Sequence, residues 1–314
     1  MLQYITIKEY RHLKHLINLW NCDFNSSYKI KKDLYHKLIL EDVNLNKDAS
    51  FVALYDNEPV GFIFIKTWLN ETGLANDSDT AHISLIFVKK EMRHMGIGSD
   101  LLKLAISEVK KHHTINKIVV GNEMNMIYPG VPNELSEAQI FFVNKGFIQK
   151  DGVVDMIRVV RNDDDTVDYN GLEILVCTEE EKDELLKLCI KNNWNKEAYL
   201  LNQYFENGGT GRRIVLGLLE GKIVAFARIN NESKLPFKIS AFIRKKKVGS
   251  IFFVKVDEEH KDKGFDVIMN KVAKNYLIKR GCSKIVVLAT KDIKFYRQLG
   301  YSAYKYYLNF ELEI

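Results

Sequence analysis

The chain repeats one structural plan, and this duplication constrains the fold more than any other feature of the sequence. Each copy has an opening strand and helix, a hairpin of two apolar strands with a tight polar turn, and a helix that ends in glycine and an aromatic residue. In the first copy these segments are 4–7 with 10–20, 51–65, and 141–147. In the second copy they are 172–176 with 179–191, 214–229, and 295–301. The sequence therefore predicts two similar α/β domains in tandem.

The predicted domains are residues 1–162 and 170–314, joined by a linker at 163–169. This division rests on the acidic, turn-forming stretch Asn162–Gly171, which separates the two copies. A chain of 314 residues is long enough to build two domains that each have their own hydrophobic core.

The first copy contains a strand, a glycine-rich turn and a helix in immediate succession. The strand runs to Val88, the turn carries Arg93, Gly96 and Gly98, and an amphipathic helix follows. Glycines remove the side chains that would keep a ligand away from the main chain. The unpaired N–H groups and positive dipole end of the helix favour an anion, to which Arg93 adds a positive charge. The segment is typical of a backbone cradle for a diphosphate.

The pattern Arg-x-x-Gly-x-Gly resembles the acetyl-CoA signature of the GNAT superfamily of N-acetyltransferases. Its context strengthens the resemblance, because the helix is followed by a strand at 117–121 and by a second helix that ends in Gly146-Phe147. The pattern is neither a dinucleotide fingerprint nor a Walker A loop. The resemblance implies an α/β (α+β) protein of two tandem GNAT folds. Each would have a mixed central sheet, splayed between its fourth and fifth strands, with helices on both faces.

The resemblance also implies a binding mode for acetyl-CoA, which the chain would use as co-substrate without a metal ion. The pantetheine arm would lie between the splayed strands, like an added strand, and the strand backbone would polarise the thioester carbonyl. The implied cofactor-binding residues are the strand positions Ile86, Phe87 and Val88, the turn and first helical residues Arg93, His94, Met95, Gly96, Ile97, Gly98 and Ser99, and Asn122, which would contact the pantetheine amide or a water molecule.

Two residues are candidates for the base that takes a proton from the acceptor amine. The family often places a glutamate six residues before the valine that ends the fourth strand, and counting back from Val88 gives His82. An imidazole titrates near neutrality and could take this role, although a histidine at the start of a strand is usually a surface or hydrogen-bonded residue. Glu123, just after the strand at 117–122, is the second candidate; otherwise it is a solvated loop carboxylate.

The usual acid of the family, a tyrosine four residues before the glycine of Gly-Phe, is replaced here by Phe142. Two alternatives remain. Tyr128, in the stiff loop Tyr128–Pro132, supplies a phenol from another direction, or water protonates the departing thiolate, whose low pKa permits this. Tyr296 keeps the tyrosine position in the second copy, where we expect it to belong to the core.

The second copy has lost part of the cradle. Lys261 stands in place of the arginine, Gly264 is kept, and Asp266 replaces the second glycine. A carboxylate at this position would repel a diphosphate. We therefore expect the second domain to bind acetyl-CoA poorly or not at all, and to close the substrate cleft or mediate dimerisation. The competing interpretation is that both domains bind the cofactor and one is catalytic.

Composition limits the classes of partner. The net charge of +5 has no basic tail, so nucleic acid is not an expected partner, and the basic run Arg244–Lys247 is expected to be a solvated turn. No apolar run approaches a membrane span, and the N-terminus is no signal peptide. Four dispersed cysteines without a Cys-x-x-Cys motif argue against zinc and fit a reducing cytoplasm.

The first hypothesis is an N-acyltransferase that moves an acetyl group to the amine of a small molecule or peptide by direct attack in a ternary complex. The alternative is a non-catalytic acyl-CoA-binding or regulatory protein, which the departures at His82 and Phe142 keep open. An aminoacyl transferase ranks last, because neither a helical-hairpin insertion nor a strongly basic surface is evident.

Overall fold

The computed structural model describes residues 1–25, 27–68, 79–160, 166–230 and 248–314. The basic run at 244–247 and residues 163–165 of the expected linker lie outside the described residues. No helix in the described ranges is both long and apolar enough to cross a membrane.

The chain forms two compact units. The first unit consists of Met1–Val153 together with Tyr306–Ile314, and the described residues between Val154 and Lys305 form the second unit. The division therefore falls inside a strand rather than in the acidic stretch. The expected domains 1–162 and 170–314 also differ from these units at the C-terminus, because the last nine residues belong to the first unit.

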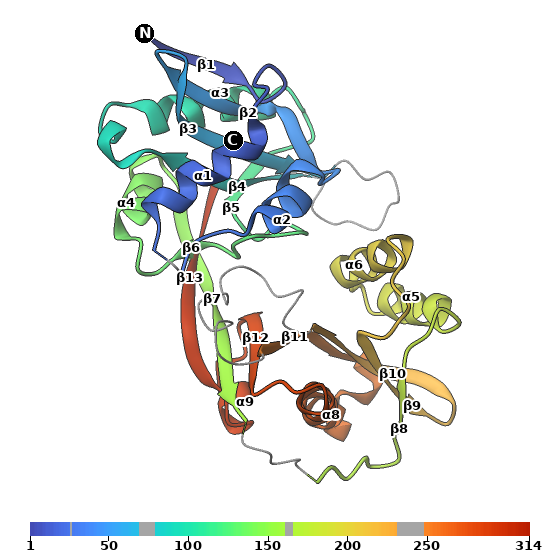
Figure 1. The fold of residues 1–314 in the computed structure, drawn as a ribbon. Coiled ribbons are helices and arrows are strands. Elements are labelled where there is room, and N and C mark those ends of the chain that lie inside the picture. The colour runs from blue at the N-terminus through green and yellow to red at the C-terminus, as the bar shows by residue number, and fades with distance from the viewer. Residues whose placement is uncertain (26, 69–78, 161–165, 231–247) are drawn as a thin grey trace. The chain divides into compact units, whose positions relative to one another are not determined.

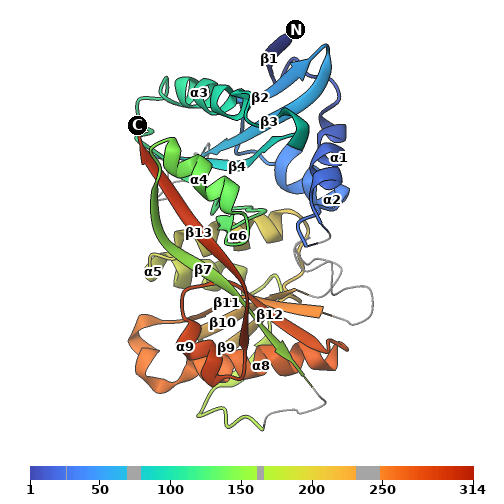
Figure 2. The ribbon, with the colours of Figure 1, turned by 90° about the vertical axis from the view of Figure 1, so that its left-hand side faces the viewer.

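The first unit is a mixed sheet with helices on both faces (Figures 1 and 2). Its elements are β1 (Leu2–Thr6), α1 (Leu13–Asp23), α2 (Lys32–Tyr35), the π-helical turn η1 (His36–Leu40), β2 (Leu45–Tyr55), β3 (Glu58–Thr67), β4 (Thr80–Val88), the 3₁₀ turn η2 (Lys90–Met92), α3 (Ile97–Val109), β5 (Lys117–Val120), β6 (Val131–Pro132), α4 (Ser136–Asn144), the start of β7 (Ile148–Val159) and the end of β13 (Ser302–Glu313). The strand order is β1-β2-β3-β4-β5-β13-β7, and β6 pairs with β13.

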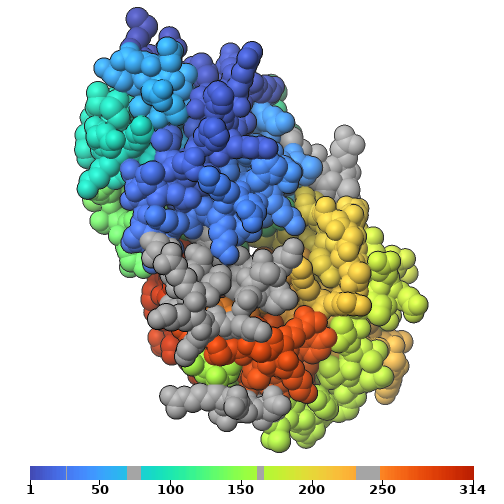
Figure 3. Space-filling model, in the orientation of Figure 1, coloured from blue at the N-terminus to red at the C-terminus, as the bar shows by residue number. Residues whose placement is uncertain are grey.

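Helix α3 covers one face of this sheet and α1 and α2 cover the other (Figure 2). In α3, Leu101, Ala105 and Val109 recur at a helical spacing and are fully buried in the core, where Phe142 of α4 and Phe310 of β13 also lie. On the face seen in Figure 3, dark blue atoms of the N-terminal residues form a large part of the surface of the first unit.

The sheet opens between β4 and β5, as the family resemblance implies. The two strands are parallel and pair only from Thr80–Lys117 to Ile83–Val120. Ser84 then forms a bulge, because Ile65 of β3 pairs with Ile83 while the preceding Phe64 pairs with Leu85. Beyond β5 the chain turns at Gly121, whose φ is +69° and whose missing Cβ would lie 2.5 Å from the carbonyl oxygen of Tyr128.

The second unit repeats this architecture. Its elements are the end of β7, β8 (Glu173–Val176), α5 (Lys182–Lys191), α6 (Asn195–Glu206), β9 (Ile214–Leu219), β10 (Lys222–Asn230), β11 (Val248–Val256), the 3₁₀ turn η5 (Glu258–Lys263), α8 (Phe265–Lys279), β12 (Lys284–Thr290), α9 (Ile293–Gln298) and the start of β13. The strand order is β7-β12-β11-β10-β9-β8, and α8 packs on β9, β10 and β11. The hairpins β2–β3 and β9–β10 confirm the predicted repeat.

The two copies exchange their last strands. The end of β13, the last strand of the second copy, pairs antiparallel with β5 in the first unit, from Glu311–Val119 to Glu313–Lys117. The end of β7, the last strand of the first copy, pairs antiparallel with β12 in the second unit. Each unit is therefore completed by residues from the other half of the sequence.

Candidate functional site

The loop between β4 and α3 has the backbone conformation of an anion cradle. His94 has a φ of +63° and Gly96 has a φ of +83°, and α3 begins at Ile97 without a side chain that caps it. The first amides of α3 therefore point out of the helix without a capping group. A Cβ at Gly96 would meet nothing within 4 Å, so it is the positive φ and not crowding that favours glycine there.

The side chain of Arg93 lies across the base of this loop. Its Nε donates to the carbonyl oxygen of Val88 at 3.1 Å, and its two terminal nitrogens lie 3.4 Å from carboxylate oxygens of Asp23 and Glu137. The arginine is thus oriented by the end of β4 and is about one-third exposed. Two carboxylates offset its charge in this conformation, so an incoming anion would compete with them for the guanidinium.

The outer half of β4 borders the opening of the sheet. Ile86, Phe87 and Val88 pair with β3 on one side, whereas the parallel pairing with β5 on the other side stops at Ile83. The opening begins at this point, where the family resemblance implies that the pantetheine arm lies. Asn122 lies just past β5, where its N–H donates to the carbonyl oxygen of Tyr128 at 3.2 Å.

A buried polar cluster lies where β4 and β5 separate. Lys66 of β3 and His82 of β4 are directly opposed in the antiparallel pair, so their side chains share a face of the sheet. The Lys66 ammonium lies 3.0 Å from Asp42 Oδ2 and 3.6 Å from Glu123 Oε1. It also donates to the carbonyl oxygens of Leu38 and Asn125, at 2.6 and 3.1 Å. These contacts connect β3 to the segment before β2, which contains Leu38 and Asp42, and to the segment after β5, which contains Glu123 and Asn125.

The two carboxylate oxygens of Glu123 differ in their contacts with the described residues. Oε1 accepts a hydrogen bond from the Ser84 hydroxyl and faces Lys66, whereas Oε2 is buried and has no hydrogen-bond partner among the described residues. The side chain of Glu123 is only 3% exposed. A buried carboxylate oxygen without a donor is costly, and a ligand that brings an N–H to it would relieve that cost.

His82 lies beside Glu123, and both line the same small pocket together with Asp42, Lys66 and Trp68. The His82 Nδ1 is 2.9 Å from the carbonyl oxygen of Gly121. A carbonyl oxygen can only accept, so Nδ1 carries the proton in this contact. The structure therefore brings His82 and Glu123, the two candidate bases, together.

Tyr128, the third predicted catalytic residue, is placed differently. Its hydroxyl donates to the carbonyl oxygen of Tyr28 at 2.9 Å, next to the ring of Trp20, and burial raises the pKa of this phenol well above its ordinary value. Tyr128 is not among the residues that line the pocket of His82 and Glu123. Phe142 packs between Phe147 and Phe310 in the core.

Sequence reasoning missed three members of the cluster, namely Asp42, Lys66 and Ser84. The only signal for Lys66 was its position at the end of the apolar run Phe62–Ile65, where a charged residue is unusual on a central strand. Ser84 lies at the bulge, which could not be read from the sequence because it depends on the pairing with β3.

At the equivalent described positions, the second unit does not carry this cluster. Its β11 has the same bulge at Phe252, because Ile229 pairs with Ile251 and Arg228 pairs with Phe253. The pairs Ile83–Val120 and Ile251–Val287 are the last pairs of the two parallel ladders, so residues at the same distance from them in the sequence are equivalent. The equivalents of Lys66, His82, Ser84 and Glu123 are Asn230, Ser250, Phe252 and Thr290.

The cradle of the second unit is also altered. Gly264 precedes α8 with a φ of +70°, like Gly96 before α3. The Asp266 carboxylate accepts a hydrogen bond from the N–H of Val267 at 2.8 Å, in the first turn of the helix. A negative side chain therefore occupies one of the amides that a bound anion would use. Tyr296 is buried in the second core, and burial together with the charge of Asp292 raises its pKa to about 12.

Comparison with solved structures finds proteins of the same fold. The chain matches the GCN5-related glucosamine N-acetyltransferase region of a fungal multi-domain GH3 β-N-acetylglucosaminidase with a TM-score of 0.86 and 18% identity, over 99% of this chain and 38% of the other. It thus spans well under half of that protein. It also matches a tandem GNAT protein from the clavulanic acid biosynthesis pathway with a TM-score of 0.70 and 13% identity, over 100% and 98% of the two chains.

A third structure, a GCN5-related N-acetyltransferase from Sphaerobacter thermophilus, matches with a TM-score of 0.69 and 10% identity, over 99% and 95% of the two chains. The comparison with curated protein sequences found no match. The model of the acetyltransferase (GNAT) family matches twice, at residues 13–126 and 178–301, once in each copy. These two matches cover most of the sequence, and the chain belongs to the acetyltransferase (GNAT) family as a tandem of two GNAT domains.

Proposed function

We propose that this acetyltransferase uses acetyl-CoA to acetylate a primary amine, and that the first unit contains its active site. The observation that carries the proposal is the buried Glu123 carboxylate, whose Oε2 has no hydrogen-bond partner among the described residues. It lies at the point where β4 and β5 separate, beside His82. An attacking amine must lose a proton, and a carboxylate at this point can accept it.

The residues of the β4–α3 loop fit the diphosphate of acetyl-CoA. Gly96 and Gly98 leave the backbone approachable, α3 presents its uncapped amides, and Arg93 supplies a positive charge. The edge of β4 at Ile86–Val88 would hold the pantetheine arm by main-chain hydrogen bonds. When bound, acetyl-CoA supplies the acetyl group as a thioester.

Three side chains would then prepare Glu123 for its role. Lys66 and the Ser84 hydroxyl hold Oε1, so the carboxylate cannot rotate freely and Oε2 faces the acceptor. Asp42 neutralises Lys66 from its other side. The described charged groups of the cluster are thus one ammonium and two carboxylates, an arrangement that favours a positively charged amine. His82 lines the same pocket and would lie beside the amine.

No phenol replaces the usual tyrosine acid in this proposal. Phe142 has no proton to give, and the hydroxyl of Tyr128 is occupied by the carbonyl of Tyr28. A thiol has an ordinary pKa near 8.5, so the departing sulfur leaves as a thiolate and water protonates it. The second unit, with Asn230, Ser250 and Thr290 at the equivalent positions, would be non-catalytic.

The test is the steady-state release of CoA from acetyl-CoA, measured with a panel of small primary amines and peptides. Sustained release above the hydrolysis background is expected for at least one amine. Glu123→Gln keeps the shape of the side chain and its bond to Ser84, and should lower kcat by about a hundredfold or more. Calorimetric binding of acetyl-CoA should be unchanged, because Glu123 is not part of the cradle.

Glu108→Gln is a matched control, since Glu108 lies on α3 and pairs with the exposed Lys111. Its kcat should equal that of the native chain. If the protein binds acetyl-CoA but no amine in the panel accelerates CoA release, the alternative of a non-catalytic acyl-CoA-binding protein replaces this proposal.

A further inference from the structure

The turn η2, which leads from β4 into the cradle, is fastened to the end of helix α1. The N–H of Lys90, the first residue of this turn, donates to Oδ2 of Asp23, the last residue of α1, at 2.9 Å. The same carboxylate oxygen lies 3.4 Å from Nη2 of Arg93. One side chain therefore contacts both the turn and the arginine of the cradle, and it has no part in the proposed reaction.

The second unit makes the same contact with an uncharged residue. Asn192 directly follows α5, and its Oδ1 accepts a hydrogen bond from the N–H of Glu258 at 3.0 Å. Glu258 begins η5 two residues after the end of β11, just as Lys90 begins η2 two residues after the end of β4. Both units thus fasten this turn to the preceding helix, and an asparagine is sufficient to do so.

The register of the two helices supports the equivalence of these helix-end residues. In α1, the buried Leu16 and Trp20 lie seven and three residues before the aspartate. In α5, the buried Leu185 and Cys189 lie seven and three residues before the asparagine. The units therefore differ in charge at this position. The carboxylate occurs in the unit that has the complete cradle, and the amide in the unit that has lost part of it.

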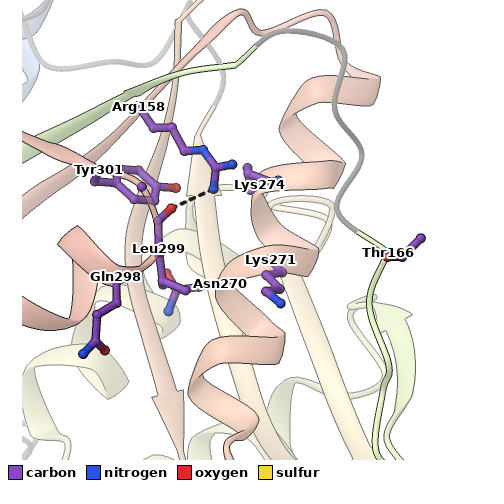
Figure 4. A pocket seen from close by; sticks show the side chains of 9 residues that line it. Arg158, Thr166, Asn270, Lys271, Lys274, Gln298, Leu299 and Tyr301 are labelled. Atoms are coloured by element: carbon purple, nitrogen blue, oxygen red, sulfur yellow. Dashed lines mark hydrogen bonds between the residues drawn. The ribbon is translucent and has the colours of Figure 1, made fainter.

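Arg93 does not need a carboxylate to be oriented. A main-chain carbonyl oxygen, which has no net charge, can orient a guanidinium, and Figure 4 shows such a contact in the second unit, from Arg158 Nη1 to the carbonyl oxygen of Leu299 at 2.7 Å. Arg93 has the same kind of contact, from Nε to the carbonyl oxygen of Val88 at 3.1 Å. The main effect of Asp23 on Arg93 is therefore its negative charge, which reduces the attraction of the guanidinium for a diphosphate.

We propose that Asp23 is a positioning residue that acts on acyl-CoA binding in two opposed ways, an inference that rests on the proposed function. Its oxygen caps the first N–H of η2, so the turn keeps the loop in the shape that the diphosphate requires. Its charge competes with the diphosphate for Arg93, so that CoA binds less tightly and leaves more readily. Asn192 has only the first of these roles, in the second unit.

The test is a calorimetric titration of acetyl-CoA into the full chain. Asp23→Asn keeps an oxygen for the N–H of Lys90 but removes the charge, so it should tighten binding about two- to threefold. Asp23→Ala also removes the cap, and should bind about fivefold or more weakly than Asp23→Asn. Glu91→Gln is the control, since Glu91 is exposed in the same turn and is not among the described carboxylates that pair with Arg93. It should leave the affinity close to that of the native chain, because salt screens an exposed charge.

Hydrogen exchange of the chain without CoA gives a second readout that does not depend on the ligand. The amides of η2 should exchange at the native rate in Asp23→Asn and faster in Asp23→Ala. Asn192→Ala removes the equivalent contact of the second unit. It should speed exchange in η5 and leave the affinity for acetyl-CoA unchanged.

Equal affinities of the two Asp23 variants would overturn the positioning role, and so would native exchange rates of η2 in Asp23→Ala. If Glu91→Gln tightens binding as much as Asp23→Asn does, general charge and not competition for Arg93 explains the gain, and the second role is wrong. A native chain that binds no acetyl-CoA would contradict the proposed function. A native chain that binds it as tightly as both Asp23 variants do would contradict only this inference.

Discussion

At the scale of single residues, the most unusual feature is the buried lysine of β3. A lysine is rarely buried completely, because removing an ammonium from water costs several kcal/mol. Lys66 is 2% exposed, yet two carboxylates and two carbonyl oxygens surround it. The cost of its burial is therefore offset only while Asp42 and Glu123 remain charged and in place, which links the stability of the first unit to the candidate active site.

Lys66→Met should destabilise the first unit by about 3–5 kcal/mol, because it leaves Asp42 and Glu123 buried without their cation. The measurement is urea unfolding followed by tryptophan fluorescence, in a chain with Trp194→Phe so that the signal comes from Trp20 and Trp68. Lys8→Met removes the exposed pair with Asp48 and should change the free energy of unfolding by about 1 kcal/mol or less. Similar effects of the two substitutions would contradict this account.

The cysteines should differ sharply in reactivity. Burial, together with nearby acidic charge, raises the pKa of both Cys177 and Cys189 to about 12. At pH 8 about one in ten thousand of each would be the reactive thiolate. Cys22 is exposed. Iodoacetamide at pH 8 should therefore label Cys22 in the folded protein and leave Cys177 and Cys189 unlabelled, as peptide mass spectrometry would show. Rapid labelling of Cys189 in the native state would contradict the burial described here.

At the scale of elements, the loop between β4 and α3 can be tested without disturbing the core. A Cβ at Gly98 would lie 3.4 Å from the ring of Phe141 and 3.6 Å from Val88, which is ordinary contact. Gly98→Asp should therefore fold, but it would place a carboxylate in the first turn of α3, where Asp266 has one in α8, and this charge would repel a diphosphate. Calorimetry should show that acetyl-CoA binding is lost.

Gly98→Ala is the matched control, since it adds the Cβ without the charge. It should retain most of the affinity, and both variants should melt within a few degrees of the native chain. If Gly98→Asp binds acetyl-CoA as tightly as the native protein, the cradle has been assigned to the wrong loop. If Gly98→Ala loses binding equally, steric crowding and not charge explains the loss.

The elements themselves were predictable because their signals are local. The hairpins at 51–65 and 214–229 and helix α3 follow from alternation, turn residues and helical periodicity, and the structure confirms them. The roles of individual site residues depend on pairings between distant segments. Glu123 could be named as a candidate, but its contacts with Ser84 and Lys66 follow from the bulge in β4, which no local pattern encodes.

At the scale of the whole molecule, the exchange of last strands makes each unit depend on the other half of the sequence. Residues 306–314 contribute Phe310, which is fully buried in the first core, and cover the edge of β5. The sequence could not reveal this, because a tandem duplication predicts the same strands whether each copy keeps its own or exchanges them. A chain divided at the expected boundary, residue 162, would accordingly separate the first unit from residues 306–314, the end of β13.

A chain that ends at residue 162 should therefore fail to fold or should associate, because it exposes an unpaired strand edge and lacks Phe310. The structure also shows how residues 306–314 can be attached directly to the first copy. Gly152 lies directly against Tyr307, and Lys150 pairs with Glu311 at 2.7 Å, so the start of β7 and the end of β13 run side by side. A two-residue Asn-Gly turn can then join Val153 to Tyr306.

The joined chain, residues 1–153 followed by Asn-Gly and 306–314, should be monomeric and bind one equivalent of acetyl-CoA in a calorimetric titration. Phe310→Ala in this chain should cost about 3–5 kcal/mol of stability, because it leaves a large cavity in the core. Tyr306→Ala, at a position that is 44% exposed, should cost far less. A chain of residues 1–162 that folds and binds acetyl-CoA as tightly as the native protein would show that the exchanged strand is dispensable. The opposite result would mean that the first unit depends on residues 306–314, the end of the strand that the second copy carries.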